Sequence, residues 1–204
     1  MNGGGDGRIF LTFDDGPDPA WTPKVLDALR RFRAKATFFV IAPLAVRFPH
    51  LTCQMTRAGH NVELHCANHT RHTELTYTAV EADARSGLQD LGTLGVLPRL
   101  WRPPWGVVTP WTRAVAKDFG LELVSWTADA HDWRGDTASE MYANVRPDLR
   151  PGAVLLMHDG LGPGARRSGC EETVTLIGKV IEQARSFGCE PCPMSDPYPR
   201  PSAG

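Results

Sequence analysis

Apolar runs and amphipathic stretches alternate along almost the whole chain. A short continuous apolar run is typical of a strand that is buried on both faces of a sheet. Residues 9–13 and 153–157 are runs of this kind. Six segments are predicted as strands: residues 8–13, 36–41, 60–64, 99–102, 121–126 and 153–157.

Each predicted strand is followed by start and stop signals for a helix. Thr22–Pro23 and Thr109–Pro110 each place a capping hydroxyl before a proline, whose missing N–H does no harm at the first helical position. Residues 78–81 and 137–140 both have the Thr-x-x-Glu pattern of a capping box. The predicted helices cover residues 22–32, 49–58, 78–94, 109–119, 137–145 and 172–187.

Regular alternation of strands and helices predicts an α/β fold with a parallel sheet. The sheet closes into a distorted (β/α) barrel of six to seven strands, or stays open as a doubly wound sheet; the pattern allows both. We expect one domain over residues 8–196, a flexible glycine-rich segment over residues 1–7 and a proline-rich tail over residues 197–204. From residue 191 onward we expect no regular structure.

Composition narrows the classes of partner. The 204 residues carry 22 basic and 23 acidic side chains, a net charge of −1. This balance favours neither nucleic acid nor an anionic membrane surface as a partner. No apolar run is long enough to span a bilayer, and the first residues lack the hydrophobic region of a signal peptide. We therefore expect a cytoplasmic protein, and a monomer.

Five cysteines are spread widely along the chain, at positions 53, 66, 170, 189 and 192. An odd, dispersed set is not typical of a secreted disulfide framework. Cys189 and Cys192 have the spacing of a zinc knuckle or a redox pair, but no second pair matches them. We interpret them as free thiols of the C-terminal tail, with a bridge from Cys170 to one of them as the alternative.

Unusual polar residues stand where the predicted strands end. Two adjacent carboxylates between a buried strand and a Gly-Pro turn have no structural use in a strand, although Asp, Gly and Pro also favour turns. The carboxyl ends of parallel strands meet at one edge, where sites form in both candidate folds. We expect these residues to converge there: Asp14, Asp15, His65, His69, Arg102, Asp129, Asp132, Trp133, His158 and Asp159.

His65 and His69 are four residues apart, so one helical turn would point both imidazoles the same way. With one carboxylate they form a His-His-Asp set, which suits zinc or another divalent transition ion and leaves positions open for water and substrate. His72, three residues from His69, is a rival ligand. His50, His60 and His131 are interpreted as surface or packing residues.

Five of the six tryptophans lie between positions 101 and 133. Trp101 and Trp126 fall on predicted strands and are expected in the core. Trp105 and Trp133 fall on loops at the edge that carries the polar residues, where an aromatic face can pack on a sugar ring or line an apolar pocket. For any one of these tryptophans, packing within the protein is as good an explanation as contact with a ligand.

Five segments in order resemble the sequence motifs of one family. The chain resembles the polysaccharide deacetylases, carbohydrate esterase family 4, whose core is the NodB homology domain, and within it the chitooligosaccharide deacetylases most. The resemblance runs from about residue 8 to residue 196, nearly the whole chain. The matching segments are residues 12–17, 59–69, 102–106, 129–133 and 156–159.

The resemblance implies a distorted (β/α) barrel and metal-dependent hydrolysis of an N-acetyl group on an amino sugar. It implies that Asp15, His65 and His69 hold the metal, with zinc expected and cobalt or nickel as alternatives. It also implies that Asp14 is the general base and His158 the general acid.

Supporting roles follow from the same resemblance. Asp129 would hydrogen-bond His158, and Arg102 would orient Asp14. Trp133 and Leu156 would line a pocket for the acetyl methyl group, and the backbone N–H of Trp105 would bind the oxyanion. Substrate contacts are thus expected at Pro103, Trp105, Trp133 and Leu156.

The chain departs from the family pattern at three positions. Cys66 stands where the second motif usually has Ser or Thr, Leu64 replaces a common Asn, and Trp105 replaces Tyr or Phe. The first change could alter hydrogen bonds around the histidines, and therefore metal affinity. A backbone contact from Trp105 needs no side chain and should persist.

Two other functions compete with the deacetylase interpretation. A metal-independent glycosidase could use Asp14 and Asp129 as paired carboxylates, but it leaves His65, His69 and Arg102 without a role. A non-catalytic carbohydrate-binding module would need no complete set of reactive residues. The substrate stays open between a chitooligosaccharide, a peptidoglycan fragment and an acetylated small-molecule glycoside.

Overall fold

The computed structural model describes residues 7–194 of the chain. The predicted tail over residues 197–204, and all of the predicted N-terminal segment over residues 1–7 except Gly7, lie outside the described range. Its strands are β1 (Arg8–Asp14), β2 (Thr37–Ile41), β3 (Asn61–Cys66), β4 (Leu100–Trp101), β5 (Glu122–Leu123), β6 (Ala128–Asp129), β7 (Val154–His158) and β8 (Glu190–Pro191).

Helices occupy most of the connections between these strands. The α-helices are α1 (Thr22–Arg31), α2 (Ala42–Arg47), α3 (Pro49–Arg57), α4 (Tyr77–Thr93), α5 (Pro110–Asp118), α6 (Ala138–Val145) and α7 (Glu171–Ser186). Short 3₁₀ turns are η1 (His72–Glu74), η2 (Pro104–Gly106), η3 (Asp132–Arg134) and η4 (Arg146–Asp148).

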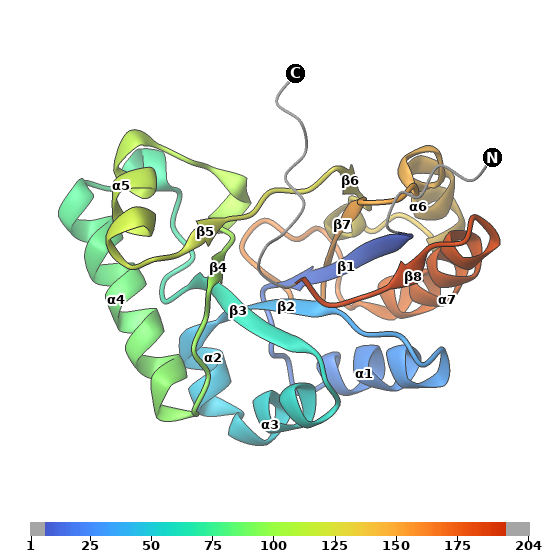
Figure 1. The fold of residues 1–204 in the computed structure, drawn as a ribbon, viewed down its shortest axis with the longest axis horizontal. Coiled ribbons are helices and arrows are strands. Elements are labelled where there is room, and N and C mark those ends of the chain that lie inside the picture. Colours follow the sequence, from blue (N-terminus) through green and yellow to red (C-terminus); the bar gives the residue numbers. More distant parts are fainter. Residues whose placement is uncertain (1–6, 195–204) are drawn as a thin grey trace.

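One parallel sheet forms the centre of the molecule. Its strand order is β5-β4-β3-β2-β1-β7-β6, and β8 pairs with the first residues of β1. The seven strands curl into a half-barrel, and no ladder among the described residues joins β5 to β6. Figure 1 shows this fan of strands with β1 and β2 at its centre. The distorted (β/α) barrel is therefore confirmed.

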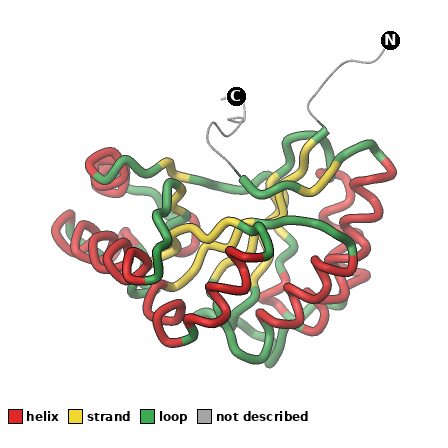
Figure 2. The backbone as a smooth tube through the Cα atoms, turned by 60° about the horizontal axis from the view of Figure 1, so that its bottom comes forward, coloured by secondary structure: helices red, strands yellow, loops and turns green. Residues whose placement is uncertain are grey.

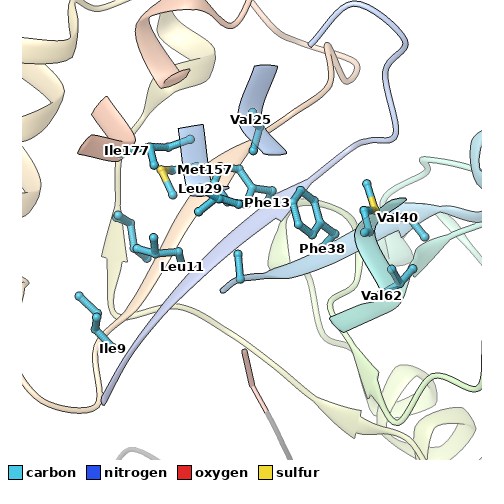
Figure 3. Close-up of a cluster of buried hydrophobic side chains, with 14 of the residues drawn as sticks. Ile9, Leu11, Phe13, Val25, Leu29, Phe38, Val40, Val62, Met157 and Ile177 are labelled. Atoms are coloured by element: carbon cyan, nitrogen blue, oxygen red, sulfur yellow. The ribbon is translucent and has the colours of Figure 1, made fainter. Parts of the chain in front are cut away.

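The two faces of the sheet bury different sets of side chains. On β1, Ile9, Leu11 and Phe13 belong to the same cluster as Leu29 of α1 and Ile177 of α7, and Figure 3 shows Phe13 beside Leu29. This outer cluster is the main core, and Figure 2 shows helices below the sheet and on both of its flanks. The smaller inner cluster contains no helical residue: Phe10, Phe39, Leu100, Val124, Val154 and Met194. An open doubly wound sheet would instead carry helices on both faces.

The start of helix α4 differs from the sequence-based expectation. The side chain of Thr76, and not Thr78, caps α4 by accepting from the amide of Ala79. Glu81 instead forms an exposed ion pair with Arg85, 2.6 Å apart. The predicted boundary was wrong because Tyr77 and Thr78 already have helical geometry. The capping boxes at the starts of α5 and α6 are present, the second as predicted.

Short elements account for the other differences. Helix α2 was not predicted: no side chain caps its start, and a six-residue helix offers little periodicity. The strand expected over residues 121–126 is only two residues long, because the ladder to β4 ends at Leu123. The short seventh strand allowed by the pattern is β6.

The C-terminal part is more ordered than expected. Residues Glu190–Pro191 form β8 against Arg8 and Ile9, so the prediction of no regular structure from residue 191 was wrong at Pro191. Residues 192–194 have no helix or strand, and the rest of that segment lies outside the described residues. Cys189 is buried and Cys192 is half-buried, and none of the five cysteines forms a disulfide. No described helix is both long enough and apolar enough to cross a membrane.

Candidate active site

Four parallel strands bring the predicted polar residues to one edge of the sheet. Asp14 ends β1 and His158 ends β7, and the two residues are register partners in the β1–β7 ladder. His65 lies near the end of β3, and Asp129 ends β6 beside β7. Because all ladders are parallel, these carboxyl ends meet, as the strand pattern predicts.

A buried arginine holds Asp14. The guanidinium of Arg102 is fully buried and donates to Asp14 Oδ1 over 2.8 Å and to the Thr12 hydroxyl over 2.7 Å. It also donates to the carbonyl of Ser125 and lies over the Phe39 ring, 4.2 Å from the centroid. The predicted contact between Arg102 and Asp14 is therefore present, and it fixes the carboxylate in one orientation.

Asp15 faces the two histidines of the β3 loop. Its Oδ1 lies 3.3 Å from His65 Nε2 and 3.1 Å from His69 Nε2. One ligand atom from each of the three residues lies within 4.8 Å of the others. His72 belongs elsewhere: its Nδ1 lies 2.9 Å from the Thr112 hydroxyl, in a buried packing position. The ligand set expected from the sequence is thus assembled without the rival histidine.

The chemistry of this cluster suits a cation. His65 Nδ1 donates to the carbonyl of Arg102 over 2.6 Å, because a carbonyl can only accept. While Nε2 also carries a proton, it donates to Asp15; when that proton is lost, the lone pair of Nε2 becomes available to a cation on the Asp15 side of the ring. Burial would raise the pKa of Asp15, but hydrogen bonds from both histidines hold it well below its ordinary value. Two imidazole nitrogens and one carboxylate oxygen are ligands that a divalent transition ion takes.

A second network surrounds His158. Its Nδ1 lies 2.7 Å from Oδ1 of Asp132, and its backbone N–H donates to Oδ2 of the same carboxylate. Arg167 and Thr173 also donate to Oδ2. Burial would lower the pKa of His158, but the charge and hydrogen bond of Asp132 raise it to about 9. Burial would raise the pKa of Asp132, but His158 and Arg167 lower it to about 2.

The expected partner of His158 was therefore wrong. Asp129 does not contact it; the Asp129 carboxylate accepts from the backbone N–H of His131 over 2.7 Å and lies 3.1 Å from the His131 ring. Asp132 takes the place because the chain turns back through η3 after His131, which has a φ of 53°. The Asp-x-x-Asp spacing in residues 129–132 was the sequence signal that a second carboxylate, Asp132, could be the partner of His158.

A cavity of about 380 Å³ opens over these groups. Among its lining residues are Asp14, Asp15, His65, His69, Asp129 and His158, together with Trp105, Trp126, Trp133 and Leu156. Three of the residues expected to contact substrate therefore line the cavity: Trp105, Trp133 and Leu156. Trp126, expected in the core, lies beyond β5; it is half-buried, packs against the inner hydrophobic cluster and also lines the cavity. Pro103 is buried outside this lining set, so the structure does not place it as a contact residue.

Sequence comparison places this site in a known family. The family model described as polysaccharide deacetylase matches residues 2–124. A chitooligosaccharide deacetylase of Bradyrhizobium is 34% identical over 198 residues, which cover 93% of this chain and 90% of that protein. The chain belongs to the polysaccharide deacetylase family.

Other polysaccharide deacetylases match to a similar extent. A peptidoglycan-N-acetylglucosamine deacetylase of Bacillus cereus is 34% identical over 182 residues, covering 88% of this chain and 83% of that protein. The structure of a family 4 carbohydrate esterase from Streptomyces lividans, in complex with acetate, matches with a TM-score of 0.84. That match has 28% sequence identity and covers 93% of this chain and 94% of the esterase. The family resemblance expected from the five motifs is confirmed.

A glycine-rich loop closes one side of the site in this member of the family. Gly160 lies against the backbone carbonyl of Asp15, and a Cβ on Gly162 would collide with the Asp15 carboxylate. The loop returns through Arg167, whose guanidinium donates to the carbonyl of His158 over 3.0 Å. Sequence reasoning missed Arg167 and Gly162, since neither stands at a strand end.

Asp159 supports the first of the five family motifs, residues 12–17, at Gly16. It is fully buried, its carboxylate lies against Gly16, and the Thr22 hydroxyl of α1 donates to it. Burial raises the pKa of Asp159 to about 7. Thr22, predicted as a helix cap, instead ties the start of α1 to the end of β7; Trp21 occupies the cap position.

Proposed function

We propose that the protein is a metal-dependent hydrolase that removes N-acetyl groups from an amino sugar in an oligo- or polysaccharide and releases acetate. Water and the amide are consumed, and the free amine of the sugar and acetate are formed. The finding that carries the proposal is the Asp15–His65–His69 cluster beside an arginine-held Asp14, at the floor of one cavity. The names of the relatives support the amide of N-acetylglucosamine as the bond that is cleaved.

Asp15, His65 and His69 would hold the metal, for which zinc is the first candidate and cobalt or nickel are alternatives. A divalent ion at this position supplies Lewis acidity toward the acetyl carbonyl and lowers the pKa of water. The histidines bind it as neutral rings, and Asp15 binds it as a carboxylate. The low pKa of Asp15 suits this role, because the carboxylate stays ionised at neutral pH.

Asp14 acts as the general base. Its carboxylate lines the cavity next to Asp15, and the two hydrogen bonds of Arg102, to Asp14 and to Thr12, prevent it from turning away. In this position it accepts the proton that the attacking water loses. General base help of this kind is worth roughly 10²–10⁴ in rate.

His158 acts as the general acid. Its Nδ1 is bonded to Asp132, so the other ring nitrogen, Nε2, is left to give its proton to the leaving amine. A pKa of about 9 keeps the imidazole cationic at neutral pH, so the proton is available when the C–N bond breaks. Asp132, with its pKa of about 2, stays ionised and holds the ring in this orientation.

The walls of the cavity suit an acetylated sugar. Leu156 and Trp133 offer an apolar contact for the acetyl methyl group, and Trp105 offers an aromatic face for a sugar ring. The backbone N–H of Trp105, in a residue with a φ of 54°, is our candidate donor to the oxyanion. The edge contact of the Trp105 ring with His69, 4.2 Å between centroids, holds this loop beside the cluster.

Acetate release from short N-acetylglucosamine oligomers tests the proposal. The protein is stripped with a chelator, assayed, and assayed again after zinc or cobalt is added back. We expect release that is lost on stripping and restored by metal. Release that survives stripping would refute the metal requirement, and the absence of release from both chitooligosaccharides and peptidoglycan fragments at one equivalent of bound metal would refute the substrate class.

A further inference from the structure

The two histidines of the metal cluster are anchored differently. The His65 ring is fixed on its far side, because Nδ1 donates to the carbonyl of Arg102. His69 Nδ1 is buried and makes no hydrogen bond within the described part of the chain. The position of the His69 ring therefore depends on the backbone that carries it, together with its edge contact with Trp105.

That backbone is held from behind by Asp83, a buried residue of α4. Its Oδ2 accepts from the amide of Ala67 over 3.1 Å, and its Oδ1 accepts from the amide of Asn68 over 2.6 Å. Oδ1 also accepts from the side-chain amide of Asn68 over 3.1 Å. One carboxylate thus binds two consecutive amides of the turn between His65 and His69, which is an arrangement that fixes the turn.

Helix α4 and the turn are in close contact around this anchor. A Cβ on Gly87, one helical turn after Asp83, would meet Leu64 and lie 3.6 Å from the amide of Ala67. Cys66 is fully buried, and its thiol makes no hydrogen bond among residues 7–194. The turn has no hydroxyl at position 66 to brace it from within. Two of its carbonyls accept hydrogen bonds, that of His65 from the Trp101 indole and that of Asn68 from the amide of Thr70, whereas the amides of Ala67 and Asn68 are both held by Asp83.

We propose that Asp83 is a positioning residue that sets the metal affinity of the cluster by holding the turn that carries His69. The proposal rests on the proposed function, since it concerns the same metal site. Asp83 lies outside the cavity lining and touches no ligand atom, so it acts only through Ala67 and Asn68. Partners that orient a metal ligand in this way are typically worth about 10–100-fold in metal affinity.

Asp83→Asn is the decisive substitution, because it keeps shape and removes one acceptor. The amide group of Asn must face one of two backbone N–H donors, which breaks at least one hydrogen bond of the turn. Asp90→Asn is the matched control, because it is the same change on the same helix. Among residues 7–194 the side chain of Asp90 makes no hydrogen bond, and only its backbone carbonyl accepts one from a side chain, the Thr93 hydroxyl. Zinc and cobalt affinities are measured by titration of the stripped proteins, and the visible spectrum of the cobalt form reports the geometry of the ligands.

We expect Asp83→Asn to weaken metal binding about 10–100-fold and to change the cobalt spectrum, with Asp90→Asn like the parent. Asn68→Ala removes only the side-chain contact and should weaken binding by a smaller factor. A lower melting temperature of stripped Asp83→Asn with unchanged affinity and spectrum would show a merely structural role and overturn the proposal. If Asp83→Asn does not fold, an unchanged affinity in Asn68→Ala overturns it. A parent protein that binds no metal refutes the proposed function itself.

Discussion

Asp14 lies opposite His158 in the parallel ladder between β1 and β7. Neighbouring strands are about 4.8 Å apart in the hydrogen-bonding direction, so the two side chains rise from adjacent positions at the same edge. Both residues line the cavity. The proposed base and acid are therefore placed by two central strands, and substitutions at these positions should change the chemistry more than the geometry.

Asp14→Asn should keep the metal and lose turnover. The ligand atoms of Asp15, His65 and His69 are untouched, whereas Asn cannot accept the proton of water. We expect the rate of acetate release to fall by roughly 10²–10⁴, with metal content equal to the parent. The variant should be assayed below its unfolding temperature, because the buried Arg102 loses its counter-charge and the fold becomes less stable. Turnover like that of the parent would remove Asp14 as the base.

Asp15→Ala is the contrasting variant for this experiment. It removes the one carboxylate that faces both histidines, 3.3 Å from His65 Nε2 and 3.1 Å from His69 Nε2. Metal content and acetate release should therefore fall together. Metal analysis of the two purified variants side by side separates a lost base from a lost ligand.

Asp132→Asn should shift the alkaline limb of the pH–rate profile. In the parent, His158 stays cationic until the pH rises through about 9, because Asp132 raises its pKa. Without the carboxylate charge the pKa of His158 falls, so activity should decline at lower pH than in the parent. Asp129→Asn should leave this limb in place, because Asp129 contacts His131 and not His158. The opposite result for the two variants would restore Asp129 as the partner.

The same pair makes the stability of the fold depend on pH at both ends. The pKa of Asp132 falls from 3.8 to about 2, so its contribution is complete above 3.8 and is lost as the pH falls through 2. The pKa of His158 rises from 6.5 to about 9, so its contribution is complete below 6.5 and is lost as the pH rises through 9. Denaturant unfolding across this range should show a broad maximum for the parent and a flatter curve for Asp132→Asn.

Much of this arrangement could be predicted from the chain because strand ends mark sites in parallel α/β folds. Asp14, His65, Arg102 and His158 each follow an apolar run, and the structure brings all four to one edge. Residues that pair along a parallel ladder lie close in space but far apart in the sequence. The regular alternation of strands and helices predicts this pairing. The same alternation predicts the parallel sheet, whereas the barrel, and not an open sheet, was implied by the family resemblance.

What the chain alone could not show depends on short irregular turns. The choice between Asp129 and Asp132 is made by a left-handed residue, His131, and a three-residue turn, which no hydrophobic period reports. Arg167 reaches the site from a glycine-rich loop, and Asp83 reaches it from the middle of a helix. In each case the side chain contacts residues that lie elsewhere in the sequence, so no local sequence pattern predicts the contact.

Leu29→Ala should test the outer core. Leu29 is fully buried between α1 and the sheet, close to Phe13 in Figure 3. Removing a buried leucine side chain costs about 2–5 kcal/mol of unfolding free energy, since lost transfer energy and a cavity add together. Leu97→Ala makes the same change at a position that is 84% exposed and should cost far less. Equal costs in denaturant unfolding would contradict the assignment of Leu29 to the core.

Gly162→Ala should weaken metal binding through steric contact alone. A Cβ at position 162 would collide with Oδ2 of Asp15, so either the carboxylate or the glycine-rich loop must move. Because Asp15 supplies the one carboxylate ligand of the cluster, we expect a lower metal affinity and a lower rate of acetate release. Gly92→Ala is the control: nothing lies within 4 Å of its added Cβ, and alanine favours the α4 helix. Titration of both stripped variants with zinc decides the matter, and a Gly162→Ala affinity equal to that of Gly92→Ala would show that the loop yields freely and does not constrain Asp15.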